Sequence, residues 1–152
     1  MRAKKVAVIA SAPSPRREAA SRRLIEATLD CIATLGLRET TVPDIAARAG
    51  MAVGSISQYF AGKEALYTAA LDAMAREFAE RVADRVAAAG PSPARRLCAY
   101  VDAYFDVRTG QRRKVAVWFA FWAEVQAQPQ YQAVCAGHDR AHDALVESLV
   151  SD

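Results

Sequence analysis

Residues 40–66 read TTVPDIAARAGMAVGSISQYFAGKEAL, and this stretch decides the fold. Thr41 and Asp44 have the capping-box spacing that begins a helix. The apolar residues that follow recur at helical spacing, at Val42, Ile45, Ala46 and Ala49. Gly50 can adopt the left-handed conformation that ends a helix. A second short helix is predicted over Val53–Phe60, and a third begins at Lys63. Two short helices around a glycine turn form a helix-turn-helix, whose second helix enters the DNA major groove.

The residues around this turn resemble the TetR family of bacterial transcriptional regulators. The family's threonine cap, I-A-x-x-A-G element, Gly-[ST]-aliphatic stretch, Tyr-Phe pair and lysine occur here in the same order. They are Thr40-Thr41, Ile45–Gly50, Gly54-Ser55-Ile56, Tyr59-Phe60 and Lys63. The segments RRLIEATLDCI (22–32), ISQYF (56–60) and AVWFAFWAEVQAQPQY (116–131) resemble BetI-type repressors, which control choline-to-betaine genes.

The resemblance implies an all-α protein with two domains. A three-helix helix-turn-helix DNA-binding domain (15–66) is joined by a connector helix to a helical ligand-binding and dimerisation domain (67–152). Family members continue through two more helices that pair with a partner subunit. The chain is therefore expected to be a fragment or a short variant, and to form a homodimer when full-length.

Glycine and proline breaks predict the helix boundaries. The first helix is expected from Pro15 to Leu35, and its core-facing residues are Ile25, Leu29, Ile32 and Leu35. A connector helix is expected from Lys63 to about Ala88, long enough to join two domains. Three further helices are expected over about 93–107, from about 111 to before Pro129, and from Pro129 onward.

The resemblance also implies which residues face DNA. They are Thr41, Ala52, Val53, Gly54, Ser55, Ser57, Gln58, Tyr59 and Lys63. Gly54 has no Cβ and lets the backbone approach DNA closely. Ser57 and Gln58 are candidates for base edges, because glutamine can pair bidentately with adenine. Tyr59 and Thr41 are candidates for phosphate oxygens, which fix register.

Two further positions carry physical arguments of their own. The helix dipole disfavours a lysine in a first helical turn, so Lys63 is easiest to explain if a DNA phosphate docks there. The family usually has serine where this chain has Ala52. The missing cap should cost the second helix about 1 kcal/mol.

Residues 1–14 are expected to form a disordered basic arm. The cations at its start and in the following turn could reach phosphates or the minor groove; they are Arg2, Lys4, Lys5, Arg16 and Arg17. A solvated tail without a DNA role is the alternative. The apolar run Val6–Ala10 is too short for a signal peptide.

Aromatic residues concentrate in the second half. Residues 115–123, VAVWFAFWA, are apolar all round and predict a helix buried on most sides. Aromatic faces attract quaternary ammonium cations, and the BetI resemblance makes choline or a related compound the first expected effector. Candidate ligand-binding residues are Tyr100, Tyr104, Trp118, Phe121 and Trp122, and Asp102, Asp106 or Glu124 could supply a carboxylate. These aromatic residues could instead simply fill the core.

Charge and reactive residues limit the function classes. Residues 1–66 carry ten Lys and Arg against six Asp and Glu, whereas residues 67–152 carry ten against eleven. A basic first half suits DNA binding. Cys31, Cys98 and Cys135 are odd in number and widely spaced, which favours reduced thiols in a cytoplasmic protein. His138 and His142 have a metal-binding spacing, but surface histidines are the favoured interpretation.

The sequence contains no catalytic constellation, so we expect no enzyme, cofactor or metal site, and no membrane association. It predicts a ligand-responsive transcriptional repressor that a small-molecule effector releases from a palindromic double-stranded DNA operator. A helical ligand-binding or protein-interaction module that no longer reads specific DNA is the alternative.

Overall fold

The computed structural model describes residues 14–105 and 111–150. These ranges contain six α-helices and one 3₁₀ helix, with no strand between them, so the all-α prediction is confirmed. The helices are α1 (Pro15–Leu35), α2 (Val42–Ala49), η1 (Val53–Gln58), α3 (Lys63–Ala88), α4 (Pro93–Phe105), α5 (Gln111–Val125) and α6 (Pro129–Val150). None of the helices in the described ranges is both long and apolar enough to cross a bilayer. The predicted basic arm lies outside the described residues except for Ser14.

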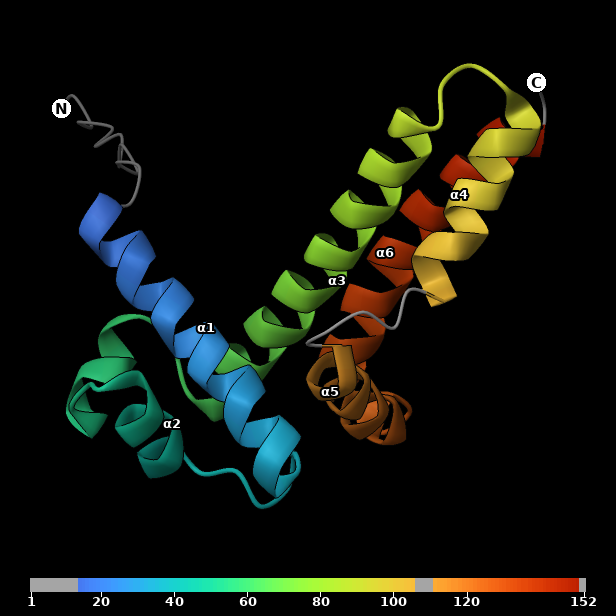
Figure 1. Ribbon diagram of the computed structural model, residues 1–152. Helices are drawn as coiled ribbons and strands as arrows, with labels where there is room; N and C mark the ends of the chain where they lie inside the picture. Colours follow the sequence, from blue (N-terminus) through green and yellow to red (C-terminus); the bar gives the residue numbers. More distant parts are fainter. Residues whose placement is uncertain (1–13, 106–110, 151–152) are drawn as a thin grey trace, which may run out of the picture.

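The long helix α3 belongs to both halves of the molecule (Figure 1). Its N-terminal end packs against α1 beside α2 and η1, and its remainder packs against α4 and α6. Helix α5 contacts both α1 and α6. With 26 residues, α3 is about 39 Å long, enough to extend from one half into the other.

Local sequence signals set several helix ends, and those at both ends of α2 were predicted. Ser14 caps α1, and Thr41 and Asp44 form both hydrogen bonds of the capping box at α2. Gly50 ends α2 in the left-handed conformation, with φ 62° and ψ 42°. Both α1 and α3 have the predicted limits. Helix α4 is described to Phe105, and the last two residues of its predicted range lie outside the described residues.

The second helix of the helix-turn-helix differs from its prediction. It is a 3₁₀ helix that ends at Gln58, not an α-helix that continues to Phe60. Ala52 provides no side-chain cap at its start. The Ser55 and Ser57 hydroxyls donate to the carbonyls of Ala52 and Gly54, at 2.7 and 3.1 Å. These local hydrogen bonds compete with the backbone hydrogen bonds of a regular α-helix. A six-residue segment forms too few α-helical hydrogen bonds to outweigh them, so it remains a 3₁₀ helix.

Two predictions about burial were wrong. Leu35 is 47% exposed, and Leu24 on the preceding turns of α1 is buried instead. Helix α5 is not buried on most sides: Phe121 is fully buried, but Phe119 and Trp122 are 63% and 71% exposed. The reason is that neighbouring helices cover only one face of α5, which contacts α1 and α6.

Three aromatic rings hold the two halves together. Phe121 of α5 packs edge-on against Tyr67 of α3 and Tyr131 of α6, with ring centroids 6.4 and 5.2 Å apart. The Tyr67 hydroxyl donates to the carbonyls of Leu37 and Thr40, at 3.2 and 2.9 Å. Burial raises the pKa of Tyr67, which keeps this phenol in its donating form. The α1–α2 connection is therefore tied to the core between the two halves.

Candidate DNA-binding surface and effector domain

The helix-turn-helix is built on a small apolar core. Ile45 of α2, Ile56 of η1 and Leu66 of α3 are all buried and belong to one cluster with α1. Val42 and Phe60 are half-buried against the same cluster. This core presents the opposite sides of the three elements to solvent.

The structure brings the predicted DNA-contact residues into one region. Each lies in η1, at an end of η1, or within one residue of the N-terminus of α2 or α3. The exposed members are Thr41, Ala52, Val53, Gly54, Ser57 and Gln58, and the half-buried members are Ser55, Tyr59 and Lys63. The arrangement offers a polar side-chain surface flanked by two helix N-termini, which suits phosphates on either side of a groove.

Gly54 has no structural reason to be glycine. A Cβ built at this position meets no heavy atom within 4 Å, and its φ lies outside the left-handed region. By contrast, Gly50 is required by its positive φ. An open glycine at the exposed surface of η1 fits close approach by an external molecule.

Lys63 occupies the first turn of α3, as predicted, and its Nζ lies 5.1 Å from the centre of the Tyr67 ring. This cation–π contact offsets part of the unfavourable dipole interaction. The lysine therefore has one internal stabilising contact, which sequence reasoning did not anticipate.

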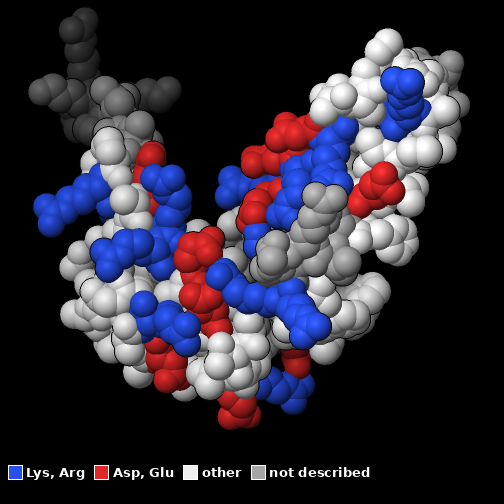
Figure 2. Space-filling view, viewed as in Figure 1, with Lys and Arg blue, Asp and Glu red and all other residues white. Residues whose placement is uncertain are grey.

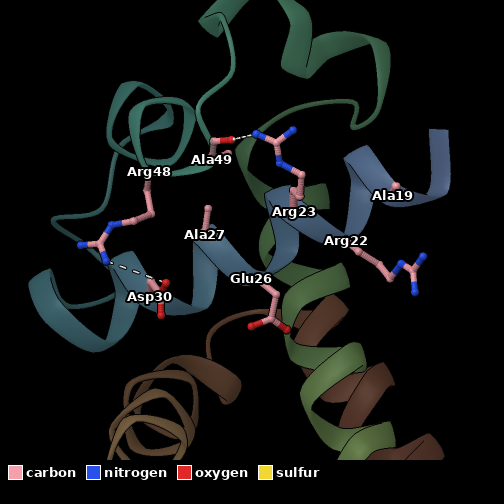
Figure 3. Close-up of a pocket in the computed structure, with 8 residues that line it drawn as sticks. All are labelled: Ala19, Arg22, Arg23, Glu26, Ala27, Asp30, Arg48 and Ala49. Carbon is pink, nitrogen blue, oxygen red and sulfur yellow. Dashed lines mark hydrogen bonds and ion pairs between the residues drawn. The ribbon is translucent and has the colours of Figure 1, made fainter. Parts of the chain in front are cut away.

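The charges around the DNA-binding half are mixed. Figure 2 shows basic and acidic side chains interspersed over the visible face, not a single positive field. A surface hollow of about 530 Å³ lies between α1 and α2 (Figure 3). Its lining residues are Ala19, Arg22, Arg23, Glu26, Ala27, Asp30, Arg48 and Ala49. Since acidic and basic groups are paired in it, with Arg48 3.8 Å from Asp30, the hollow does not resemble an anion site.

In the second half, two predicted ligand residues meet a histidine. The Tyr100 hydroxyl lies 2.5 Å from His142 Nε2, and the Tyr104 hydroxyl lies 2.7 Å from His142 Nδ1. Phe78 of α3 packs edge-on against Tyr104, with centroids 4.9 Å apart. The pKa of Tyr104 is raised above its ordinary value, mainly by burial and to a smaller extent by the hydrogen bond with Tyr100. Aromatic groups from α3, α4 and α6 thus form one cluster.

The other three predicted ligand residues lie on α5 and are separated by burial. Phe121 is buried with Tyr67 and Tyr131 in the core between the two halves. Trp118 is half-buried against that core, and Trp122 faces solvent. Among the candidate carboxylates, Glu124 is paired with Arg38 at 2.6 Å, Asp102 is exposed, and Asp106 lies outside the described residues. The structure therefore brings Tyr100 and Tyr104 together but not all five aromatic residues.

The two histidines are not simple surface residues, which corrects the sequence interpretation. Both are half-buried, and each has a partner on another helix. His138 Nε2 lies 3.1 Å from Asp72 Oδ1, and His142 bridges the two tyrosines. Within the described residues, no three His, Cys, Asp or Glu side chains gather as a metal site would require.

An arginine of α5 links the second half of the molecule to α1 in the helix-turn-helix half. Arg113 Nη2 lies 2.9 Å from Glu26, and Nη1 lies 2.7 Å from Asp30, both on α1. Its Nε atom is buried and has no hydrogen-bond partner among the described residues. Sequence reasoning missed this contact because no spacing rule relates residues 87 positions apart.

Comparison with known families agrees with this architecture. Residues 24–70 match the model for bacterial regulatory proteins of the tetR family, and residues 93–152 match the model for the C-terminal domain of BetI-type transcriptional repressors. Together the two matches cover the helix-turn-helix, the start of α3 and the helices from α4 onward.

Individual curated relatives are regulators of the BetI type. The chain is 35% identical over 119 residues to the HTH-type transcriptional regulator BetI 1 of Chromohalobacter salexigens, covering 78% of this chain and 59% of the relative. It is 37% identical over 132 residues to BetI of Escherichia coli O17:K52:H18, covering 86% and 66%. The chain thus spans 59% and 66% of the lengths of these curated relatives.

Solved structures share the fold. A candidate transcriptional regulator from Pseudomonas aeruginosa PAO1 superposes with a TM-score of 0.78 at 27% identity, covering 94% of this chain and 68% of that one. A candidate regulator from Saccharomonospora viridis, solved in complex with choline, has a TM-score of 0.73 at 21% identity, covering 86% and 66%. With matched sequence models in both halves and the helix-turn-helix in place, this chain belongs to the tetR family of bacterial regulatory proteins and has a BetI-type C-terminal domain.

Proposed function

We propose that this chain is a ligand-responsive transcriptional repressor that acts in the cytoplasm as a homodimer. It binds a double-stranded DNA operator through η1 and the N-terminal ends of α2 and α3, and a small-molecule effector held by the second half releases it. The single observation that carries the DNA-binding role is the open Gly54 on the exposed side of η1, which the fold itself does not require.

The neighbouring side chains support separate roles in base recognition and in phosphate binding. Gln58 is exposed at the end of η1, where its amide is free to read a base edge. Lys63 lies at the N-terminus of α3, where the helix dipole favours a phosphate. Thr41 lies at the N-terminus of α2, but its hydroxyl and its backbone N–H already donate to Asp44, so it is the weaker phosphate contact of the two. Ser57 already donates to the Gly54 carbonyl, so it is the weaker base reader of the two predicted.

The effector is proposed to be a quaternary ammonium compound, and choline is the first to test. The BetI-type match of residues 93–152 supports this class, as does the choline found with the fold neighbour from Saccharomonospora viridis. Tyr100 and Tyr104 are the strongest predicted contacts, because they share one aromatic cluster with Phe78 and His142. Electron-rich ring faces attract a quaternary ammonium group, which has no N–H to donate.

The route from effector to DNA is proposed to pass through α3 and α5. Helix α3 carries both Lys63 at the DNA end and Phe78 in the aromatic cluster. Helix α5 is fixed to α1 by Arg113 and to the α1–α2 connection by the Arg38–Glu124 pair. A movement of either helix would change the separation of two recognition helices in a dimer. Effector and operator would then lower each other's affinity by the same factor.

A titration of the protein with DNA flanking its own gene tests the DNA-binding function. We expect a dissociation constant of about 10⁻⁸ M or lower on the operator, against about 10⁻⁴ to 10⁻⁶ M on random DNA. Gln58→Ala should reduce discrimination between bases, whereas Lys63→Ala should weaken both DNAs equally and lower the salt slope by about 0.9. Binding that never exceeds the random-DNA level would favour the alternative, a helical interaction module that does not read specific DNA.

Choline added to the operator complex tests the second half. We expect choline to weaken operator binding, and Tyr104→Ala to abolish that response while the operator affinity without choline is retained. For the coupling route, Arg113→Ala should reduce the response, whereas Arg112→Ala, which removes the same charge from an exposed neighbour, should not. Equal responses in both arginine variants would rule out the α1–α5 ion pairs as the route.

A further inference from the structure

The recognition element η1 has little internal support. It is a six-residue 3₁₀ helix, and Ala52 at its start makes no side-chain cap. Only Ile56 anchors it in the core, with 4% of its surface exposed. A short 3₁₀ helix has poor hydrogen-bond geometry, and the carbonyls at its end need partners from elsewhere.

One such partner comes from the first turn of α1. Arg17 Nη2 donates to the Gln58 carbonyl at 2.8 Å, across 41 residues of sequence. The same guanidinium lies 5.7 Å from the centre of the Tyr59 ring. The Ser14 hydroxyl accepts from the Arg17 backbone N–H at 3.4 Å, which fixes the turn that carries the arginine. A cation at the carbonyl end of a helix is favourable on electrostatic grounds.

A second arginine of α1 makes the equivalent contact with the preceding helix. Arg23 Nη2 donates to the Ala49 carbonyl at 2.5 Å, at the carbonyl end of α2 (Figure 3). It fills the space beside Gly50, where a Cβ would lie 3.3 Å from the same nitrogen. The two guanidiniums therefore hold the ends of both helices of the helix-turn-helix against α1.

We propose that Arg17 is a positioning residue for DNA recognition, which holds the carbonyl end of η1 against α1 and does not itself serve as a phosphate contact. This inference rests on the DNA-binding function proposed above. The restrained carbonyl belongs to Gln58, whose side chain is the proposed base reader, so releasing it changes where the amide is presented. From the sequence, Arg17 was one of five cations that could reach phosphates or the minor groove, with no DNA role as the alternative.

The test compares Arg17→Ala with Arg16→Ala, which removes the same charge from an exposed neighbour in the same turn. Amide hydrogen exchange in the free proteins is the first readout. We expect Arg17→Ala to accelerate exchange over residues 53–60 and leave α3 unchanged, and Arg16→Ala to do neither. Thermal unfolding midpoints should remain close to that of the starting protein, because Arg17 is exposed and the buried core is untouched.

DNA titrations give the second readout. In Arg17→Ala, the ratio of operator to random-DNA affinity should fall roughly three- to tenfold, as expected for the loss of one solvent-exposed hydrogen bond of ordinary net strength. The salt dependence of operator binding should stay unchanged. An equal loss on both DNAs with a salt slope reduced by about 0.9 would instead identify a phosphate contact and overturn the proposal.

The two hypotheses can fail separately. If the starting protein does not distinguish operator from random DNA, the proposed function fails, but the exchange experiment still decides whether Arg17 restrains η1. Unchanged exchange over residues 53–60 in Arg17→Ala overturns the positioning role whatever the DNA result.

Discussion

Replacing Gly54 with alanine tests whether this glycine is required for the stability of the fold or for operator binding. The added Cβ would meet no heavy atom of the protein within 4 Å, and the backbone φ is not in the left-handed region. The free protein therefore loses no contact. Because alanine reduces the conformational entropy of the unfolded chain, the free energy of unfolding should rise by up to about 0.5–1 kcal/mol.

On DNA the same methyl group should be costly. If the η1 backbone approaches the groove closely at Gly54, the methyl is forced into a packed interface, which costs about 1–3 kcal/mol. That penalty corresponds to a dissociation constant about 5- to 140-fold weaker on the operator. Gly54→Ala is therefore expected to be at least as stable as the starting protein and to bind its operator less tightly.

Gly137→Ala is the matched control. Gly137 lies in α6, a Cβ there also meets nothing within 4 Å, and its φ is likewise outside the left-handed region. This substitution should stabilise α6 and leave operator affinity unchanged. Fluorescence anisotropy with labelled operator and urea unfolding measure the two quantities for both variants. If Gly54→Ala binds the operator as tightly as Gly137→Ala, the reasoning about close backbone approach is refuted.

Three further outcomes are expected. Ala52→Ser should add the missing cap to η1 and slow amide exchange there, with a gain of about 1 kcal/mol in local stability. Phe121→Ala should lower the free energy of unfolding, measured by urea titration, by about 3–5 kcal/mol, because its ring is fully buried. Trp122→Ala, on the exposed face of the same helix, should change that free energy by less than about 0.5 kcal/mol. Similar losses in both variants would contradict the assigned burial. Hydrogen bonds from the Thr41 side chain and backbone lower the pKa of Asp44 below its ordinary 3.8, so the stability from its carboxylate is present above that value and is lost as the pH falls through the lower folded-state pKa. Asp44→Asn should therefore make the unfolding midpoint less dependent on pH below about 4, and an unchanged acid profile would count against the capping role.

The local elements of the fold were predictable because their signals are local. The capping box at Thr41 and Asp44 depends on residues three positions apart, and the left-handed end of α2 depends on Gly50 alone. The limits of α3 follow in the same way from Gly62 before it and the Gly90–Pro91 break after it. Where serine hydroxyls compete for backbone carbonyls within η1, the same local reasoning failed to distinguish a 3₁₀ helix from an α-helix.

Part of the candidate site was likewise predictable from local sequence signals, and part of it was not. The motif order predicted which residues share the region around η1, because they are close in sequence and the turn brings them together. The positions of the aromatic residues in the second half could not be predicted in this way: Tyr100 and Tyr104 lie in one cluster, but Phe121 is buried between the two halves and Trp122 faces solvent. An apolar helix carries no periodic signal that tells which face will be covered.

Caps, helix breakers and motif order act over a few residues, so the helices, the helix-turn-helix and the family could be predicted from the sequence. Tertiary packing determined how the two halves are joined, through the edge-on contacts of Phe121 with Tyr67 and Tyr131 and through the Arg113 bridge to α1. It also decided that Arg17 contacts a backbone carbonyl, 41 residues away in sequence. Such contacts depend on how helices pack in three dimensions, and a side chain's partner across that distance is set by the packing of the whole chain and not by its neighbours in sequence.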